Sequence, residues 1–244
     1  MDIANDVYIR HRIDPQPGDA DYLHLSDLLL ALKALNRGRY GKVLDYGCGG
    51  SPYRSLFEPC TYHRADLEGA NGLDFAYGPQ AGLPADIGGY DCVLSTQVLE
   101  HVEAPGPYLR EAFRVLKPGG HLLLTTHGLF QDHGCPYDYW RWTVYGLTRA
   151  VEDAGFKVED IKKLTTGPRG AIFLAERELG KMHFRRSDIA GGLLSLGVKA
   201  LNRLGDRRRH MSCDASFAEN RVVDLAAPFH DIYVAIAVRA VRRG

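Results

Sequence analysis

Residues 43–50 read Val-Leu-Asp-Tyr-Gly-Cys-Gly-Gly, a short apolar strand that runs directly into a glycine-rich turn. Glycine has no Cβ, so Gly47 and Gly49 allow a ligand to approach the backbone closely. In a parallel sheet such a turn lies at the carboxyl end of its strand, which is where these sheets bind ligands. The stretch therefore predicts a ligand site at the end of the first strand of an α/β sheet.

The segments around this turn alternate between strand and helix patterns. Strand patterns lie at 42–46, 62–66, 72–75, 90–95, 121–126, 156–164 and 230–238, and helix patterns at 21–37, 52–57, 107–116 and 143–154. Such alternation predicts a mostly parallel sheet covered by helices on both faces. Residues 170–227 interrupt it with a helix pattern at 189–204, which predicts either a helical cap over the site or a long loop.

The composition is that of one globular domain in the cytosol. Lys and Arg number 30, as do Asp and Glu, so no basic excess favours nucleic acid as a partner. The amino terminus does not resemble a signal peptide, and no apolar run is long enough to span a membrane. The cysteines are odd in number and scattered, which is typical of reduced thiols; they are Cys48, Cys60, Cys92, Cys135 and Cys213.

Two acidic residues favour one cofactor class over another. A dinucleotide turn needs a third glycine, but that position is Pro52, and the carboxylate of Asp45 would repel a diphosphate. The same carboxylate complements the ammonium and sulfonium of S-adenosylmethionine, directly or through hydrogen bonds. Asp66 ends the second strand, where it can accept hydrogen bonds from both ribose hydroxyls.

Four motifs in order resemble those of the class I S-adenosylmethionine-dependent methyltransferases. Residues 43–49 resemble the family's first motif and Asp66 the acid of its second. Residues 91–102 (Asp-Cys-Val-Leu-Ser-Thr-Gln-Val-Leu-Glu-His-Val) are similar to its fourth-strand region, and residues 116–124 (Leu-Lys-Pro-Gly-Gly-His-Leu-Leu-Leu) to the entry of its fifth strand. The resemblance covers residues 42–165 well.

The resemblance implies an α/β fold, a Rossmann-like three-layer sandwich with a seven-stranded, mostly parallel sheet. Its last strand would insert antiparallel beside the fifth, with the helical insertion before it. One domain, 1–244, would comprise a helical cap (1–40), a donor-binding core (41–168), an insertion or lid (169–228) and the last strand (229–244). The implied donor contacts are Asp45, Gly47, Gly49, Asp66, Leu67 and Gln97, with Asp74 and Phe75 at the adenine.

The loop at residues 126–143 is rich in side chains suited to an acceptor site. His127, His133 and His101 are candidates for a general base, and Asp138 could orient one of them. Aromatic walls with a few polar groups suit a sugar, polyketide or aromatic acceptor. The predicted acceptor contacts are Tyr137, Tyr139, Trp140 and Arg141. The loop is also similar to one in bacterial methyltransferases associated with glycan or natural-product biosynthesis.

Other interpretations of this loop remain open. Its aromatic rings could simply pack the loop onto the sheet, with Asp138 and Arg141 as a buried pair. Glu100 and His101 could begin a helix that touches no ligand. The set His127, His133, Cys135 and Asp138 has no standard zinc spacing, so the sequence predicts no metal site.

The sequence thus predicts an enzyme that methylates a small molecule, with oxygen the favoured acceptor atom. S-adenosylmethionine is the cofactor and S-adenosylhomocysteine the product. Neither nucleic acid nor membrane is an expected partner, and a homodimer is left open. The alternatives are a nicotinamide-dependent oxidoreductase on a similar sheet and a non-catalytic relative that binds the donor.

Overall fold

The computed structural model describes residues 3–16, 19, 21–70, 72–78, 82–180, 197, 200 and 232–244. The elements are α1 (Ile3–Ile13), α2 (Tyr22–Leu35), β1 (Lys42–Tyr46), η1 (Arg54–Leu56), β2 (Thr61–Leu67), β3 (Phe75–Tyr77), β4 (Tyr90–Thr96), η2 (Leu99–His101), α3 (Pro105–Val115), β5 (Leu116–His127), α4 (Val144–Asp153), β6 (Phe156–Thr166), α5 (Gly167–Gly180) and β7 (Tyr233–Arg242). Within the described residues, no helix has the length and hydropathy that a bilayer span would require.

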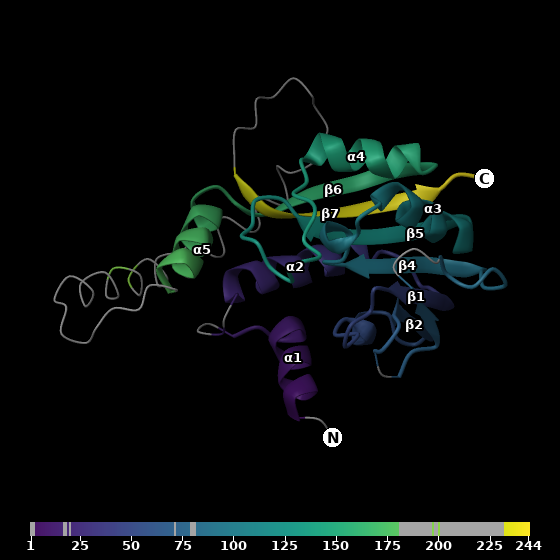
Figure 1. The fold of residues 1–244 in the computed structure, drawn as a ribbon, viewed down its shortest axis with the longest axis horizontal. Coiled ribbons are helices and arrows are strands. Elements are labelled where there is room, and N and C mark those ends of the chain that lie inside the picture. Colours follow the sequence, from purple (N-terminus) through teal and green to yellow (C-terminus); the bar gives the residue numbers. More distant parts are fainter. Residues whose placement is uncertain are drawn as a thin grey trace.

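The seven strands form one sheet in the order β3-β2-β1-β4-β5-β7-β6 (Figure 1). The first five strands in this order run parallel to one another, and β7 runs antiparallel between β5 and β6. This confirms the predicted seven-stranded, mostly parallel sheet and the antiparallel last strand. Because β1, β2, β4 and β5 run in the same direction, the residues that follow them meet at one edge of the sheet.

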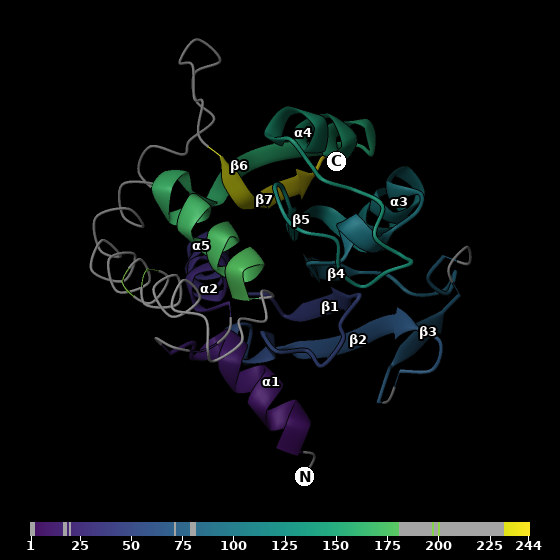
Figure 2. The ribbon, with the colours of Figure 1, turned by 60° about the vertical axis from the view of Figure 1, so that its left-hand side comes forward.

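Alternating side chains of these strands build two apolar layers. On one face, Leu44 and the buried residues of β4 and β5 pack against α3 and α4. On the other face, Val43 packs with the leucines of α2. The helices thus cover both sides of the sheet, and α5 lies against α2 (Figure 2).

Several predicted boundaries are wrong in detail. The helix expected at 52–57 is only the short 3₁₀ turn η1, and the strand expected at 72–75 begins at Phe75. The last strand continues to Arg242, and α1 was not recognised as a separate helix. The helix expected at 189–204 and most of the insertion at 169–228 lie outside the described residues, apart from α5.

Candidate active site

The glycine corner after β1 (residues 47–50) has a backbone shape that favours glycine at two positions. Gly47 has φ +76°, and a Cβ there would lie 2.6 Å from the methyl groups of Val98. Gly49 has φ +47°, but a Cβ there would meet its nearest neighbour, Tyr8 Oη, at 3.6 Å. Conformation and space both require glycine at position 47, whereas conformation alone favours it at position 49.

Asp66 closes this corner from the end of β2. The backbone N–H of Gly49 donates to Asp66 Oδ2 at 2.6 Å, and that of Leu67 donates to Oδ1 at 2.8 Å. An ionised carboxylate can accept about four hydrogen bonds, so both oxygens keep capacity for a further donor. The partly exposed Asp66 can therefore accept from ligand hydroxyls while it holds the corner.

Asp45 lies beneath the corner and not in it. Its side chain is almost completely buried on the α2 face, and its Oδ2 accepts a hydrogen bond from Tyr62 Oη at 2.7 Å. Burial raises the pKa of Asp45 to about 7, against the opposing effect of the Tyr62 hydrogen bond. Of the two possibilities that the sequence left open, direct contact with the donor or action through hydrogen bonds, this burial favours the second.

Gln97 follows β4 at the same edge of the sheet. It has φ +55°, its backbone N–H donates to Thr125 O at 2.9 Å, and its Nε2 donates to Thr125 Oγ1 at 3.1 Å. Its Oε1 is buried and has no hydrogen-bond partner among the described residues. A buried amide oxygen without a partner is costly, so a ligand ammonium or hydroxyl that donated to it would be favoured.

Arg64 also belongs to this corner, although the sequence interpretation did not include it. Its guanidinium donates to Gly49 O at 2.7 Å, to Gly72 O at 2.7 Å and to Ser51 Oγ at 2.9 Å. These bonds tie the glycine corner to the loop that follows β2. Its position two residues before Asp66 places both side chains on the same face of β2, and this spacing is the signal that could have identified it.

Asp74 and Phe75 lie beside the last residues of β2. Asp74 Oδ2 accepts the backbone N–H of Arg64 at 2.7 Å, and the Phe75 ring contacts the ring of His63, with centroids 5.5 Å apart. The strand expected at 72–75 begins only at Phe75, which pairs with Ala65, next to Asp66. The adenine contact of these two residues stays a prediction.

Four histidines from four segments gather beside the end of β5. His24 comes from α2, His101 from η2, His127 from the end of β5 and His133 from the following loop; we call them the histidine cluster. The ring centroid of His133 lies 4.6 Å from that of His101 and 4.7 Å from that of His127. His24 lies 5.6 Å from His127 by the same measure and was not identified from the sequence. Burial lowers the pKa of His24 to about 4 and also lowers those of His127 and His133.

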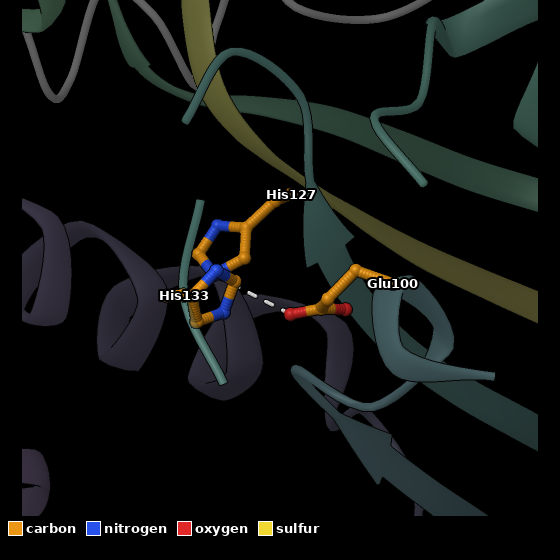
Figure 3. Close-up of side chains that lie close together, drawn as sticks. All are labelled: Glu100, His127 and His133. Carbon is orange, nitrogen blue, oxygen red and sulfur yellow. Dashed lines mark ion pairs between the residues drawn. The ribbon is translucent and has the colours of Figure 1, made fainter. Parts of the chain in front are cut away.

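Glu100 is the acidic side chain of this region and is completely buried. Thr126 Oγ1 donates to its Oε2 at 2.8 Å, and its Oε1 lies 3.4 Å from His127 Nε2 (Figure 3). Burial raises the pKa of Glu100 and lowers that of His127, so each group favours its uncharged form more than it would in water. Oε1 has no hydrogen-bond partner among the described residues. From the sequence, Glu100 was interpreted only as part of a possible helix start, because nothing in its local pattern indicates that it meets the histidines.

Asp138 and Arg141 form a bidentate ion pair within the loop. Arg141 donates to both Asp138 oxygens at 2.7 Å, and this bonding lowers the pKa of Asp138. Its other three N–H groups donate to the backbone oxygens of Phe130, Gln131 and Trp140. All five guanidinium donors are therefore used inside the loop. Arg141 shapes the loop, as the alternative of an Asp138–Arg141 pair anticipated, and its contact with the acceptor stays a prediction.

Asp138 also positions His133. Asp138 Oδ2 accepts the backbone N–H of His133 at 2.9 Å and lies 3.6 Å from its Nδ1. The histidine that Asp138 was expected to orient is thus identified as His133. Next to it, His101 Nδ1 donates to the backbone oxygen of Tyr137 at 2.7 Å.

The aromatic side chains predicted to contact the acceptor are largely exposed. Tyr137 is 63%, Tyr139 43% and Trp140 39% exposed. Trp140 is held in place because its Nε1 donates to Val102 O at 2.8 Å and its ring stacks on that of Trp142. These rings therefore leave apolar surface available beside the histidine cluster.

The family described as "Methyltransferase domain" matches residues 18–161. A ubiquinone biosynthesis O-methyltransferase of Caulobacter vibrioides is 33% identical, over 34% of this chain and 40% of that protein. A fatty-acid O-methyltransferase of Mycolicibacterium smegmatis is 33% identical, over 46% of this chain and 43% of that protein. The chain thus spans about two fifths of the length of these curated relatives.

Solved structures show the same fold. A phosphoethanolamine N-methyltransferase of Haemonchus contortus, in complex with S-adenosylhomocysteine, matches with a TM-score of 0.53 and 15% identity, over 99% of this chain and 57% of that one. The predicted fold is therefore confirmed. The family match covers more than half of the sequence, from α2 to β6, and the chain belongs to the methyltransferase domain family.

Proposed function

We propose that the protein transfers the methyl group of S-adenosylmethionine to an oxygen atom of a small-molecule acceptor. The observation that carries this proposal is the position of the histidine cluster. His127 ends β5, and Thr125, two residues earlier in the same strand, is hydrogen-bonded to Gln97, which follows β4. Donor corner and histidines therefore share one edge of the sheet, where a donor methyl group and an acceptor hydroxyl could meet.

The reaction requires alignment and one proton transfer. The acceptor oxygen attacks the methyl carbon in line, the carbon–sulfur bond breaks, and its electron pair stays on sulfur to give S-adenosylhomocysteine. The hydroxyl proton passes to a neutral imidazole of the histidine cluster. Asp45, Asp66 and Gln97 would favour the donor through charge and hydrogen bonds, with Asp45 acting from beneath the corner.

Three features support a small acceptor. The curated relatives named above are O-methyltransferases. The balanced charge disfavours nucleic acid, and the exposed rings of Tyr137 and Trp140 suit the apolar faces of a sugar or polyketide.

A cytosolic location fits the four free cysteines among the described residues.

Binding experiments separate this proposal from its oxidoreductase alternative. Calorimetric titration should show stoichiometric binding of S-adenosylhomocysteine and none of NAD. The reverse result would refute the proposal. A panel of a phenol, a sugar, a hydroxylated polyketide and a fatty acid then tests for S-adenosylhomocysteine release. A protein that bound the donor but methylated none of these would favour the non-catalytic alternative.

A His133→Gln variant tests the role of the histidine cluster in catalysis. We expect kcat to fall about 10²–10⁴-fold, the usual contribution of a general base, while the Kd for S-adenosylmethionine stays unchanged. His121→Gln is the matched control, because His121 lies six residues before His127 in the middle of β5, beside Glu159. Undiminished turnover in the His133 variant would contradict the assignment.

A further inference from the structure

Three side chains beside the end of β5 point toward one another from separate segments (Figure 3). They are Glu100 from η2, His127 from β5 and His133 from the loop, and one ligand atom of each lies within 4.8 Å of the other two. We propose that these three residues bind a divalent transition-metal ion, with Zn²⁺ preferred. Binding of the ion does not depend on the proposed methyl transfer, whereas its catalytic use does.

The spacing of the ligand atoms suits a tetrahedral ion. Metal–ligand distances of about 2.1 Å at tetrahedral angles place neighbouring ligand atoms about 3.4 Å apart. His127 Nε2 and Glu100 Oε1 are 3.4 Å apart. His133 is half-buried and lies on a loop, so rotation about its side-chain bonds can bring its ligand atom to the same separation.

The surroundings of Glu100 also favour a cation. Its Oε1 is completely buried and has no hydrogen-bond partner among the described residues, a costly arrangement that a metal ion would relieve. The other oxygen is held by Thr126 Oγ1 at 2.8 Å, which fixes the carboxyl group as an outer-shell hydrogen bond does in known metal sites.

His133 has a similar support. Asp138 Oδ2 lies 3.6 Å from His133 Nδ1, which leaves Nε2 to face the ion. A carboxylate behind a metal-binding imidazole is a recurrent arrangement, because it fixes the tautomer and orientation of the ring. Asp138 is itself held by Arg141, so the support is rigid.

The ligand set indicates both the metal and its use. Two imidazoles and one carboxylate suit Zn²⁺ and neighbouring transition metals, whereas Mg²⁺ prefers oxygen ligands. Three protein ligands leave a fourth position open. On the proposed function, an acceptor hydroxyl at that position would become more acidic and so a better nucleophile toward the methyl group. With the ion bound, His133 would act as its ligand, and the hydroxyl proton would pass to the neighbouring imidazole of His101, whose ring centroid lies 4.6 Å from that of His133.

The sequence could not indicate this set. It suggested His127, His133, Cys135 and Asp138, with no zinc spacing, and predicted no metal. The structure combines only the two histidines of that set with Glu100, while Cys135 is exposed.

A Co²⁺ titration of tag-free, chelator-treated protein tests the proposal without donor or acceptor. We expect one equivalent to give the visible absorption of tetrahedral Co²⁺, displaced by Zn²⁺ but not by Mg²⁺. His133→Gln and Glu100→Gln should each weaken binding at least about 100-fold, since even outer-shell partners contribute 10–100-fold. His121→Gln should bind as the wild type does.

Wild-type protein that binds no stoichiometric Co²⁺ or Zn²⁺ would overturn the proposal, and so would a His133→Gln variant of unchanged affinity. If Glu100→Gln fails to fold, His133→Gln decides, because its side chain is 27% exposed on a loop. Methyl transfer that persists in chelated protein would remove the catalytic use and leave the proposed function intact. Metal binding without methyl transfer to any acceptor would count against the proposed function alone.

Discussion

The glycine corner and the histidine cluster lie at the same edge of the sheet but are formed by different parts of the chain, the backbone in one and side chains in the other. The corner consists of peptide groups: its shape comes from Gly47 and Gly49, and its hydrogen bonds from backbone N–H groups to Asp66. The histidine cluster consists of side chains from four segments, held within a mainly apolar surrounding. The glycine corner depends on two residues that have no side chain, whereas the histidine cluster depends on side chains that meet from separate segments.

This difference predicts different responses to substitution. A backbone-built site should fail when any side chain is added in the wrong place, because neither strain nor lack of space can be relieved locally. A side-chain-built site should lose its chemistry when one member changes, while its framework persists. The predictions below test this contrast in order of expected effect.

Gly47→Ala should have the largest effect. The new Cβ would overlap Val98 and force a strained φ, costing about 2–5 kcal/mol of unfolding free energy. Gly49→Ala is the matched variant, because only the strain applies there, and it should cost about 1–2 kcal/mol. Urea denaturation measures both. Equal losses at the two positions would show that the overlap with Val98 is not decisive.

Asp66→Ala should weaken the binding of S-adenosylmethionine about 10–100-fold, because charge-assisted hydrogen bonds contribute about 1.5–3 kcal/mol each. Asp74→Ala provides the comparison: Asp74 contacts the backbone N–H of Arg64, which in turn holds Gly49, so we expect a smaller loss of donor affinity. Calorimetry measures both constants. A loss in the Asp74 variant as large as that in the Asp66 variant would support the adenine contact that the sequence suggested.

Asp45 should give a smaller, pH-dependent effect. Its pKa of about 7 means that the carboxyl is mostly protonated at pH 6 and mostly ionised at pH 8. A cationic donor favours the ionised form, so affinity for S-adenosylmethionine should rise with pH by at most about tenfold over this range. The donor's own amino group titrates nearby, so the informative quantity is the difference from Asp45→Asn. An identical slope in that variant would exclude Asp45 as the cause.

The sequence predicted the donor corner well because its determinants are contiguous. Residues 43–50 carry their own conformational requirement, and Asp66 follows at the end of the next strand. The boundary of the third strand was predicted less well: β3 begins three residues later than expected, so Asp74 precedes the strand, and its contact with the adenine stays a prediction.

The histidine cluster could be predicted only in part, for a different reason. His101, His127 and His133 were chosen because imidazoles suit acid–base chemistry, but His24 and Glu100 are brought to them by packing alone. Arg141 was predicted to contact the acceptor, but all five of its hydrogen bonds lie within the loop. Residue type suggests what a side chain can do, whereas the contacts decide which of those roles remains.

The position of β7 affects the order in which the protein can be assembled. β5 carries His127, and its residues 121–127 pair with β7, so that His127 faces Ala235 across the ladder. During synthesis, residues 116–127 emerge long before residues 233–242, so β5 lacks this second neighbour until the later segment has been made. Formation of the sheet beside the histidines is thus one of the last folding steps, and such long-range pairing is intrinsically slow.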